Sequence, residues 1–113
     1  MSPDETRVWV AIAARHGRAS AISAGELASR TGLSDRTVRK IVKTLIEDHG
    51  YPIASSPHPP AGYFVPAELP EILEALDSLK GRALSILVRM SRLRRTTLRE
   101  TVDQLLLELK DAA

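Results

Sequence analysis

The chain has 113 residues, of which 43% are hydrophobic and 27% charged, a composition typical of one compact globular domain with an appendage. It contains no cysteine, which excludes disulfides and thiolate metal sites. The net charge is only +2, but segments 15–43 and 80–99 each carry seven basic residues, while segment 68–77 carries four acids and no base. This distribution predicts a polyanionic partner, with nucleic acid as the first candidate.

Capping signals predict three helices in the first half of the chain. Ser2 as N-cap, Pro3 at the first helical position and Glu5 three residues after the cap open a helix that is over by Gly17. After a short linker, in which Ile22 forms a brief strand, a capping box at 23–26 opens a second helix that Gly32 closes.

The third predicted helix carries the functional signal. Ser34 is its N-cap, and it runs to about residue 48. One face is apolar and the remaining faces are largely basic. Leu33 anchors the turn before it, and Gly32 allows the positive φ that a tight interhelical turn needs. A helix of this kind fits the DNA major groove.

Two strands, at 51–55 and 62–65, are predicted after Gly50. The loop between them, 56–61, holds three prolines and His58. Because prolines stiffen the backbone, we expect a hairpin with a rigid, protruding tip.

Apolar residues after Pro66 alternate spacings of three and four, which predicts a helix of about 26 residues with a heptad seam. The seam consists of Leu69, Ile72, Leu76, Leu79, Ala83, Ile86, Met90 and Leu93. A final helix begins after Thr97. We expect these helices to form a coiled-coil homodimer, because a lone helix that exposes such a seam is unstable. A monomeric hairpin, or packing of the seam against the chain's own first domain, stays open.

Residues 6–66 resemble the winged helix-turn-helix domains of bacterial and phage regulators, above all the biotin-operon repressor and the DeoR-type regulators. The resemblance rests on Leu27-Ala28, Gly32-Leu33-Ser34 and Thr37-Val38, followed by Gly50 and the hairpin. It implies a mainly α fold with a small β-hairpin wing at 1–66. The heptad seam predicts that 67–113 is a C-terminal helical dimerisation segment. No ligand-binding or enzymatic domain follows the wing, so no small-molecule effector is expected, and the wing tip carries neither Arg nor Lys.

The resemblance implies a double-stranded DNA-binding protein that reads the major groove with helix 34–48, as a transcriptional regulator or a phage-type replication or recombination accessory. The candidate DNA-binding residues are Arg30, Ser34, Arg36, Thr37, Arg39, Lys40, Lys43 and His58. The alternative is an interaction module that binds a polymerase or replisome component. In that case the basic face of helix 34–48 is a solvated helix surface.

Other functional classes find little support in the sequence. The three histidines, His16, His49 and His58, are far apart and lack the helical spacing of metal ligands. No phosphate-binding loop or catalytic triad is visible, so we expect neither an enzyme nor a cofactor. The charged segment 1–15 is not a signal peptide, and no apolar run reaches the roughly 18 residues of a membrane span. We therefore expect a cytoplasmic protein.

Overall fold

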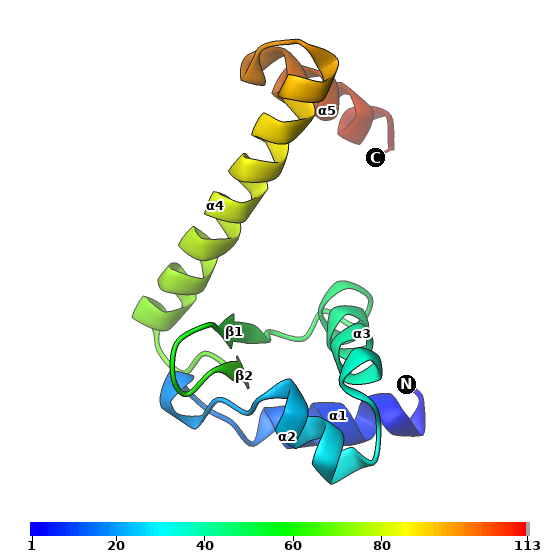
Figure 1. The fold of residues 1–113 in the computed structure, drawn as a ribbon, viewed down its shortest axis with the longest axis vertical. Coiled ribbons are helices and arrows are strands. Elements are labelled where there is room, and N and C mark those ends of the chain that lie inside the picture. The colour runs from blue at the N-terminus through cyan, green and yellow to red at the C-terminus, as the bar shows by residue number, and fades with distance from the viewer. Residues whose placement is uncertain (113) are drawn as a thin grey trace. The chain divides into compact units, whose positions relative to one another are not determined.

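The computed structural model describes residues 1–112. The chain divides into two compact units, Met1–Ala75 and Leu76–Ala113 (Figure 1). The first unit contains helices α1 to α3 and a two-stranded hairpin, and the long helix α4 begins in it and continues into the second. This confirms the predicted fold class, a mainly helical chain with a β-hairpin wing and long C-terminal helices.

The helices of the first unit begin at the residues that the capping signals indicate. Helix α1 spans Pro3–Ala13 and has a complete capping box, in which the Glu5 backbone N–H donates to Ser2 Oγ over 3.1 Å. Helix α2 spans Ala24–Thr31 and is capped by Ser23. Gly32 then adopts the left-handed conformation, with φ 75°, so the chain can turn sharply into α3, Asp35–Glu47.

The wing differs from its prediction in the first strand. Strand β1 is Ala54–Ser56 rather than 51–55, and β2 is Gly62–Phe64. The Tyr51 N–H still donates to the Leu45 carbonyl at the end of α3, over 3.0 Å, and Pro52 has no N–H to give to a partner strand. The chain therefore cannot enter the hairpin before residue 54.

Ile22, where the sequence predicts a brief strand, forms an isolated β-bridge that ties the wing to the helices. It exchanges two backbone hydrogen bonds with Tyr63, of 2.9 and 2.8 Å. A second bridge joins His16 to Val65. The Gly62 backbone lies so close to the Ile22 backbone that a Cβ added to Gly62 would be 2.2 Å from the Ile22 carbonyl oxygen. Only glycine fits at this approach of two backbones.

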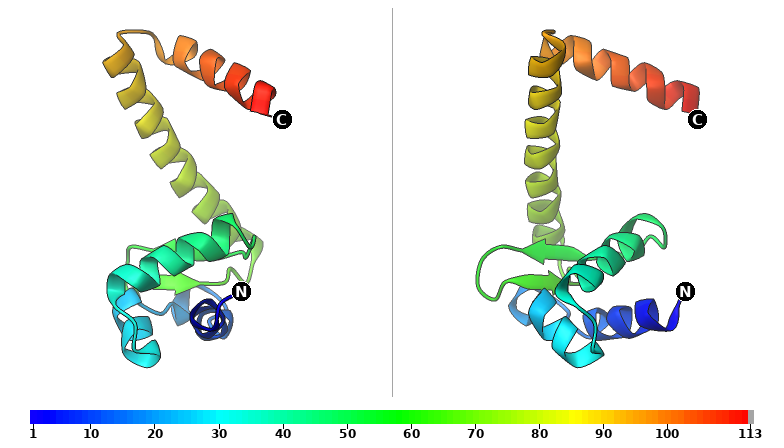
Figure 2. Two further views of the ribbon diagram at one scale, coloured as in Figure 1. Left: turned by 90° about the vertical axis from the view of Figure 1, so that its right-hand side faces the viewer. Right: turned by 45° about the vertical axis from the view of Figure 1, so that its right-hand side comes forward.

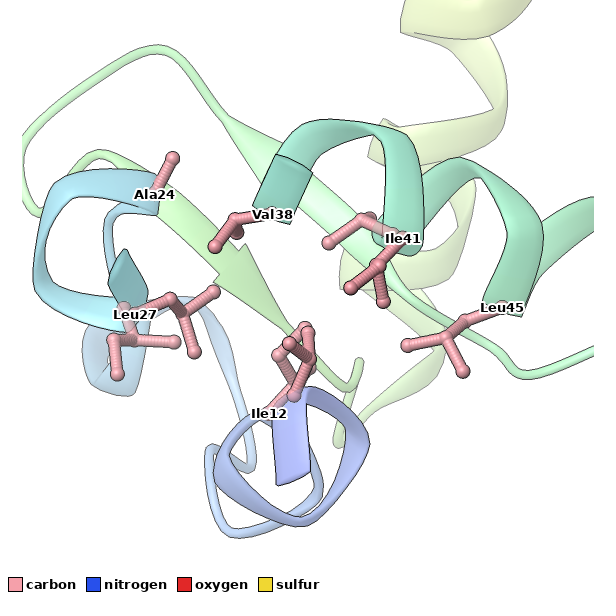
Figure 3. Close-up of a cluster of buried hydrophobic side chains, with 9 residues drawn as sticks. Ile12, Ala24, Leu27, Val38, Ile41 and Leu45 are labelled. Atoms are coloured by element: carbon pink, nitrogen blue, oxygen red, sulfur yellow. The ribbon is translucent and has the colours of Figure 1, made fainter. Parts of the chain in front are cut away.

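The core of the first unit lies between the three helices and the wing (Figure 3). Val8 and Ile12 enter it from α1, Leu27 from α2, and Val38 and Leu45 from α3, and none of these five side chains is accessible to solvent. The α3 contribution follows the spacing of three and four that the sequence shows. Burial of this stripe determines which face of α3 remains outside.

The C-terminal helices are α4, Leu69–Arg94, and α5, Leu98–Ala112. Helix α4 has the predicted 26 residues. Thr97 caps α5, because its hydroxyl accepts the Glu100 backbone N–H over 3.1 Å. Across residues 1–112, no helix combines the length and the apolarity that crossing a membrane requires.

Candidate nucleic-acid interface

The outward face of α3 is strongly basic. Its inner face is formed by Val38, Ile41, Val42 and Leu45, all buried. At 100° per residue, the four cations of the helix fall within an arc of about 100° on the other side. These are Arg36, Arg39, Lys40 and Lys43, and all four are exposed. The fold therefore gathers four predicted site residues on one accessible surface, the α3 basic face.

None of these four cations forms an ion pair in the part of the chain that the structure describes. The remaining arginines of the first unit behave differently. Each of them contacts a carboxylate, as the pairs Arg7–Asp4, Arg15–Glu26, Arg18–Glu74 and Arg30–Glu26 show. Every arginine of this unit outside α3 therefore has a carboxylate neighbour, with Glu26 shared by Arg15 and Arg30.

The α3 basic face does not stabilise the fold. Arg36 neighbours Arg39 and Lys40 at spacings of three and four, and Lys43 neighbours the same two residues at four and three. Like charges at these spacings destabilise a helix by about 0.2–0.5 kcal/mol for each pair. Four such pairs cost about 1–2 kcal/mol. A ligand with negative charge removes this cost.

The N-terminus of α3 offers further polar groups. Ser34 Oγ accepts the Thr37 backbone N–H over 3.1 Å and donates to Thr37 Oγ1 over 2.9 Å. The Thr37 hydroxyl therefore keeps its own proton for an external acceptor. Asp35, exposed in the first turn, is the one negative group beside them. Backbone N–H groups and the helix dipole also favour an anion at this end.

Arg30 and His58 lie in settings that their sequence positions did not indicate. The Arg30 guanidinium donates to Glu26 Oε1 over 2.8 Å, so its charge is partly neutralised. His58 is exposed at the wing tip, where its backbone N–H and carbonyl both bond to Ser56 Oγ, at 3.3 and 3.1 Å. These bonds hold the start of the tip, as the predicted rigid loop requires, and leave the imidazole outside.

Ile46 on α3 was not predicted from the sequence as a contact residue. It is 40% exposed and lies beside Arg39 and Lys43 at spacings of seven and three. The signal was present, because at 100° per residue Ile46 lies about 90° from the centre of the buried stripe of α3, at the edge of the basic face. An apolar side chain at the edge of a basic face is a suitable contact for a sugar or a thymine methyl group.

Two carboxylates, of Glu71 and Glu5, tie neighbouring elements of the domain together. Hydrogen bonds from the Arg18 and Ala67 backbone N–H groups, of 2.8 and 2.9 Å, lower the pKa of Glu71, which anchors the first turns of α4 to the winged domain. The pKa of Glu5 is lowered first by the Ser2 backbone N–H and then by His49, whose Nε2 lies 2.8 Å from Glu5 Oε2.

Residues 1–112 hold no cluster of His, Asp or Glu that suits a metal ion.

Comparison with known proteins agrees with the helix-turn-helix arrangement of this region. Residues 15–64 match a family model described as an HTH domain. No curated protein and no solved structure matches the chain. The matched segment runs from just after α1 through α2, the Gly32 turn, α3 and both wing strands. Residues 15–64 therefore form a helix-turn-helix domain with a β-hairpin wing.

Proposed function

We propose that this chain binds double-stranded DNA and reads its major groove with α3. The observation that carries the proposal is the contrast in charge pairing. Four exposed cations of α3 have no carboxylate partner within residues 1–112, whereas the four arginines elsewhere in the unit contact carboxylates. This is the arrangement expected of a phosphate-contacting surface.

The geometry of a helix-turn-helix domain assigns roles along α3. Its early residues face base edges, and later ones approach the backbone. We assign Arg36, Thr37, Arg39 and Lys40 to contacts with bases or the nearby backbone, and Lys43 to phosphate. Ser34 positions Thr37 and the helix N-terminus for this task.

Two further residues are assigned to the edges of the interface. Arg30 contacts phosphate once DNA competes with Glu26 for its guanidinium. His58 reaches a flanking groove or backbone from the wing tip. We propose a regulator of the biotin-operon repressor or DeoR type, or a replication or recombination accessory.

The test is a fluorescence-anisotropy titration against random duplex DNA at several salt concentrations. Each phosphate contact contributes about 0.9 to the slope of log K against log salt. Four contacts weaken binding about 150-fold between 50 and 200 mM salt, and two contacts weaken it about 12-fold. The double variant Arg39→Ala, Lys40→Ala is therefore expected to lower the slope by about 1.8.

Arg7→Ala is the matched control, because it also removes an exposed cation, but one on α1 that is paired with Asp4 and donates to the Thr31 carbonyl. Its salt slope is expected to equal that of the wild type. Absence of binding at low salt, or equal slopes in the α3 variant and the control, would overturn the proposal. Absence of binding would favour the alternative of a protein-interaction module, whereas equal slopes would place the DNA contact on another surface.

A further inference from the structure

The C-terminal helices carry far more exposed apolar surface than the winged domain. Of the sixteen large hydrophobic side chains that are exposed, thirteen lie in α4 or α5. Leu76, Leu79 and Ile86 are 55–56% exposed on α4, Leu93 is 86% exposed, and Leu109 on α5 is 66% exposed. Patches of this extent on a single chain mark an interaction surface.

Helix α4 is apolar over more than a heptad seam. At 100° per residue, the seam residues from Leu69 to Leu93 occupy one strip. Leu73, Leu84 and Leu87 form a second strip beside it. Together the two strips cover about half of the helix circumference, whereas a two-stranded coiled coil needs only the seam. Helix α4 therefore has apolar surface for more than one neighbouring helix.

The chain's own α5 does not supply this cover. The two helices meet at a polar corner, where Ser91 Oγ donates to Thr101 Oγ1 over 2.8 Å and Thr96 Oγ1 lies 3.2 Å from the same atom. Ser91 and Thr101 are the buried residues of this corner, at 5% and 1% exposure. Beyond it α5 diverges from α4 (Figure 2). A satisfied and buried set of hydroxyls fixes the corner in this form.

The charges of the two helices are complementary and unused. The segment from Lys80 to Arg95 carries six basic residues and no acid, whereas α5 carries four acids and two bases. No ion pair joins the two helices within residues 1–112. In the acidic segment at the start of α4, Glu71 and Glu74 already contact Arg18.

We propose that a second copy of this chain covers both apolar strips. In the dimer, α5 of each copy lies against the basic half of α4 of the other, and the two α4 seams meet. The four helices then bury the leucines and isoleucines of both chains and pair the acids of α5 with the bases of α4. This proposal concerns the C-terminal unit and stands apart from DNA binding.

The first test is the solution mass of the full chain by light scattering. The wild type is expected at twice the 12.4 kDa of one chain. Leu76→Glu with Ile86→Glu is expected to give the mass of a monomer. Thr6→Glu with Ser29→Glu adds the same charges at exposed positions of the winged domain and is expected to remain dimeric. A monomeric wild type at 100 μM overturns the proposal, and so does a seam variant that keeps the dimer mass.

The second test shows which copy provides α5. One variant carries Asp103→Lys and Glu108→Lys on α5, and the other carries Lys80→Glu and Arg92→Glu on α4, which lie within and beside the second strip. Each alone places like charges together and is expected to dimerise at least tenfold more weakly than the wild type. An equimolar mixture is expected to form a heterodimer, because each α5 then meets an oppositely charged α4. If α5 folds onto its own α4, mixing restores nothing, and the proposed arrangement is refuted.

Discussion

Gly62→Ala probes the junction between the wing and the helices. At φ 142°, Gly62 has a conformation that costs a residue with a Cβ about 1–3 kcal/mol. The new Cβ would also lie 2.2 Å from the Ile22 carbonyl oxygen and 2.7 Å from the Ser23 nitrogen, so the two backbones must separate. Separation breaks both Ile22–Tyr63 hydrogen bonds, each of which contributes about 0.5–1.5 kcal/mol.

The expected loss is therefore about 2–6 kcal/mol, a large share of the roughly 5–15 kcal/mol by which small domains are stable. Urea unfolding at one fixed protein concentration measures it. Trp9 is the sole tryptophan and stacks on Tyr51 with 4.1 Å between ring centroids, so its fluorescence follows this unit. For a slope near 2 kcal/mol per molar urea, the midpoint falls by at least about 1 M.

Gly25→Ala is the matched control for the same chemical change. Gly25 lies in α2, where the nearest atom to an added Cβ is Ser23 Oγ at 3.9 Å. This substitution is expected to leave the stability unchanged or to raise it by up to about 1 kcal/mol, because alanine favours the helix. If Gly62→Ala lowers the stability by less than about 1 kcal/mol relative to Gly25→Ala, the reasoning on the junction is wrong.

Three further predictions test the N-cap of α3, the hydrogen bonds that Glu71 accepts, and the pairing of Arg30 with Glu26. Ser34→Ala removes the α3 cap and is expected to lower the unfolding free energy by about 0.5–2 kcal/mol in the same assay. Because the folded state lowers the pKa of Glu71, its contribution is present above the ordinary value of 4.5 and is lost as the pH falls through the folded pKa. Glu71→Gln is thus expected to destabilise at pH 7, with a difference that vanishes in acid. Glu26→Gln frees Arg30 and is expected to strengthen DNA binding and to steepen its salt dependence.

Controls for these variants come from neighbouring positions. Ser29→Ala, on the exposed side of α2, is expected to leave stability unchanged, and an equal loss there would refute the cap assignment. Glu68→Gln should keep the wild-type difference between pH 7 and pH 4, since Glu68 is exposed and forms no side-chain hydrogen bond among the described residues. If Glu26→Gln weakens DNA binding, Arg30 does not contact phosphate.

Local chemistry made most of the fold predictable. Ser2, Ser23 and Ser34 bond to backbone N–H groups three residues away, so the helix starts could be read from the sequence. Gly32 specifies the turn between α2 and α3, because glycine adopts the positive φ that this turn requires. The start of the wing was predicted wrongly because Tyr51 is held by Leu45, a tertiary bond without a local signature.

The pairing of charges could not be predicted, although it carries the functional argument. Arg18 contacts Glu71 and Glu74 across more than fifty residues of chain, and Arg15 contacts Glu26 across a turn and a helix start. From composition alone, segment 15–43 was therefore interpreted as one basic segment. In the fold, its three arginines outside α3 contact carboxylates, and only the four cations of α3 form no ion pair among the described residues.

The separation of the two sides of α3 has an evolutionary consequence. The outward positions 36, 39, 40 and 43 form no ion pair or side-chain hydrogen bond among the described residues, while the core depends on Val38, Ile41, Val42 and Leu45. Replacing the outward residues therefore costs little folding free energy and relieves like-charge repulsion. Under the proposed function, descendants of this gene can therefore change the DNA sequence that α3 contacts by single substitutions on an unchanged scaffold, without first acquiring stabilising mutations.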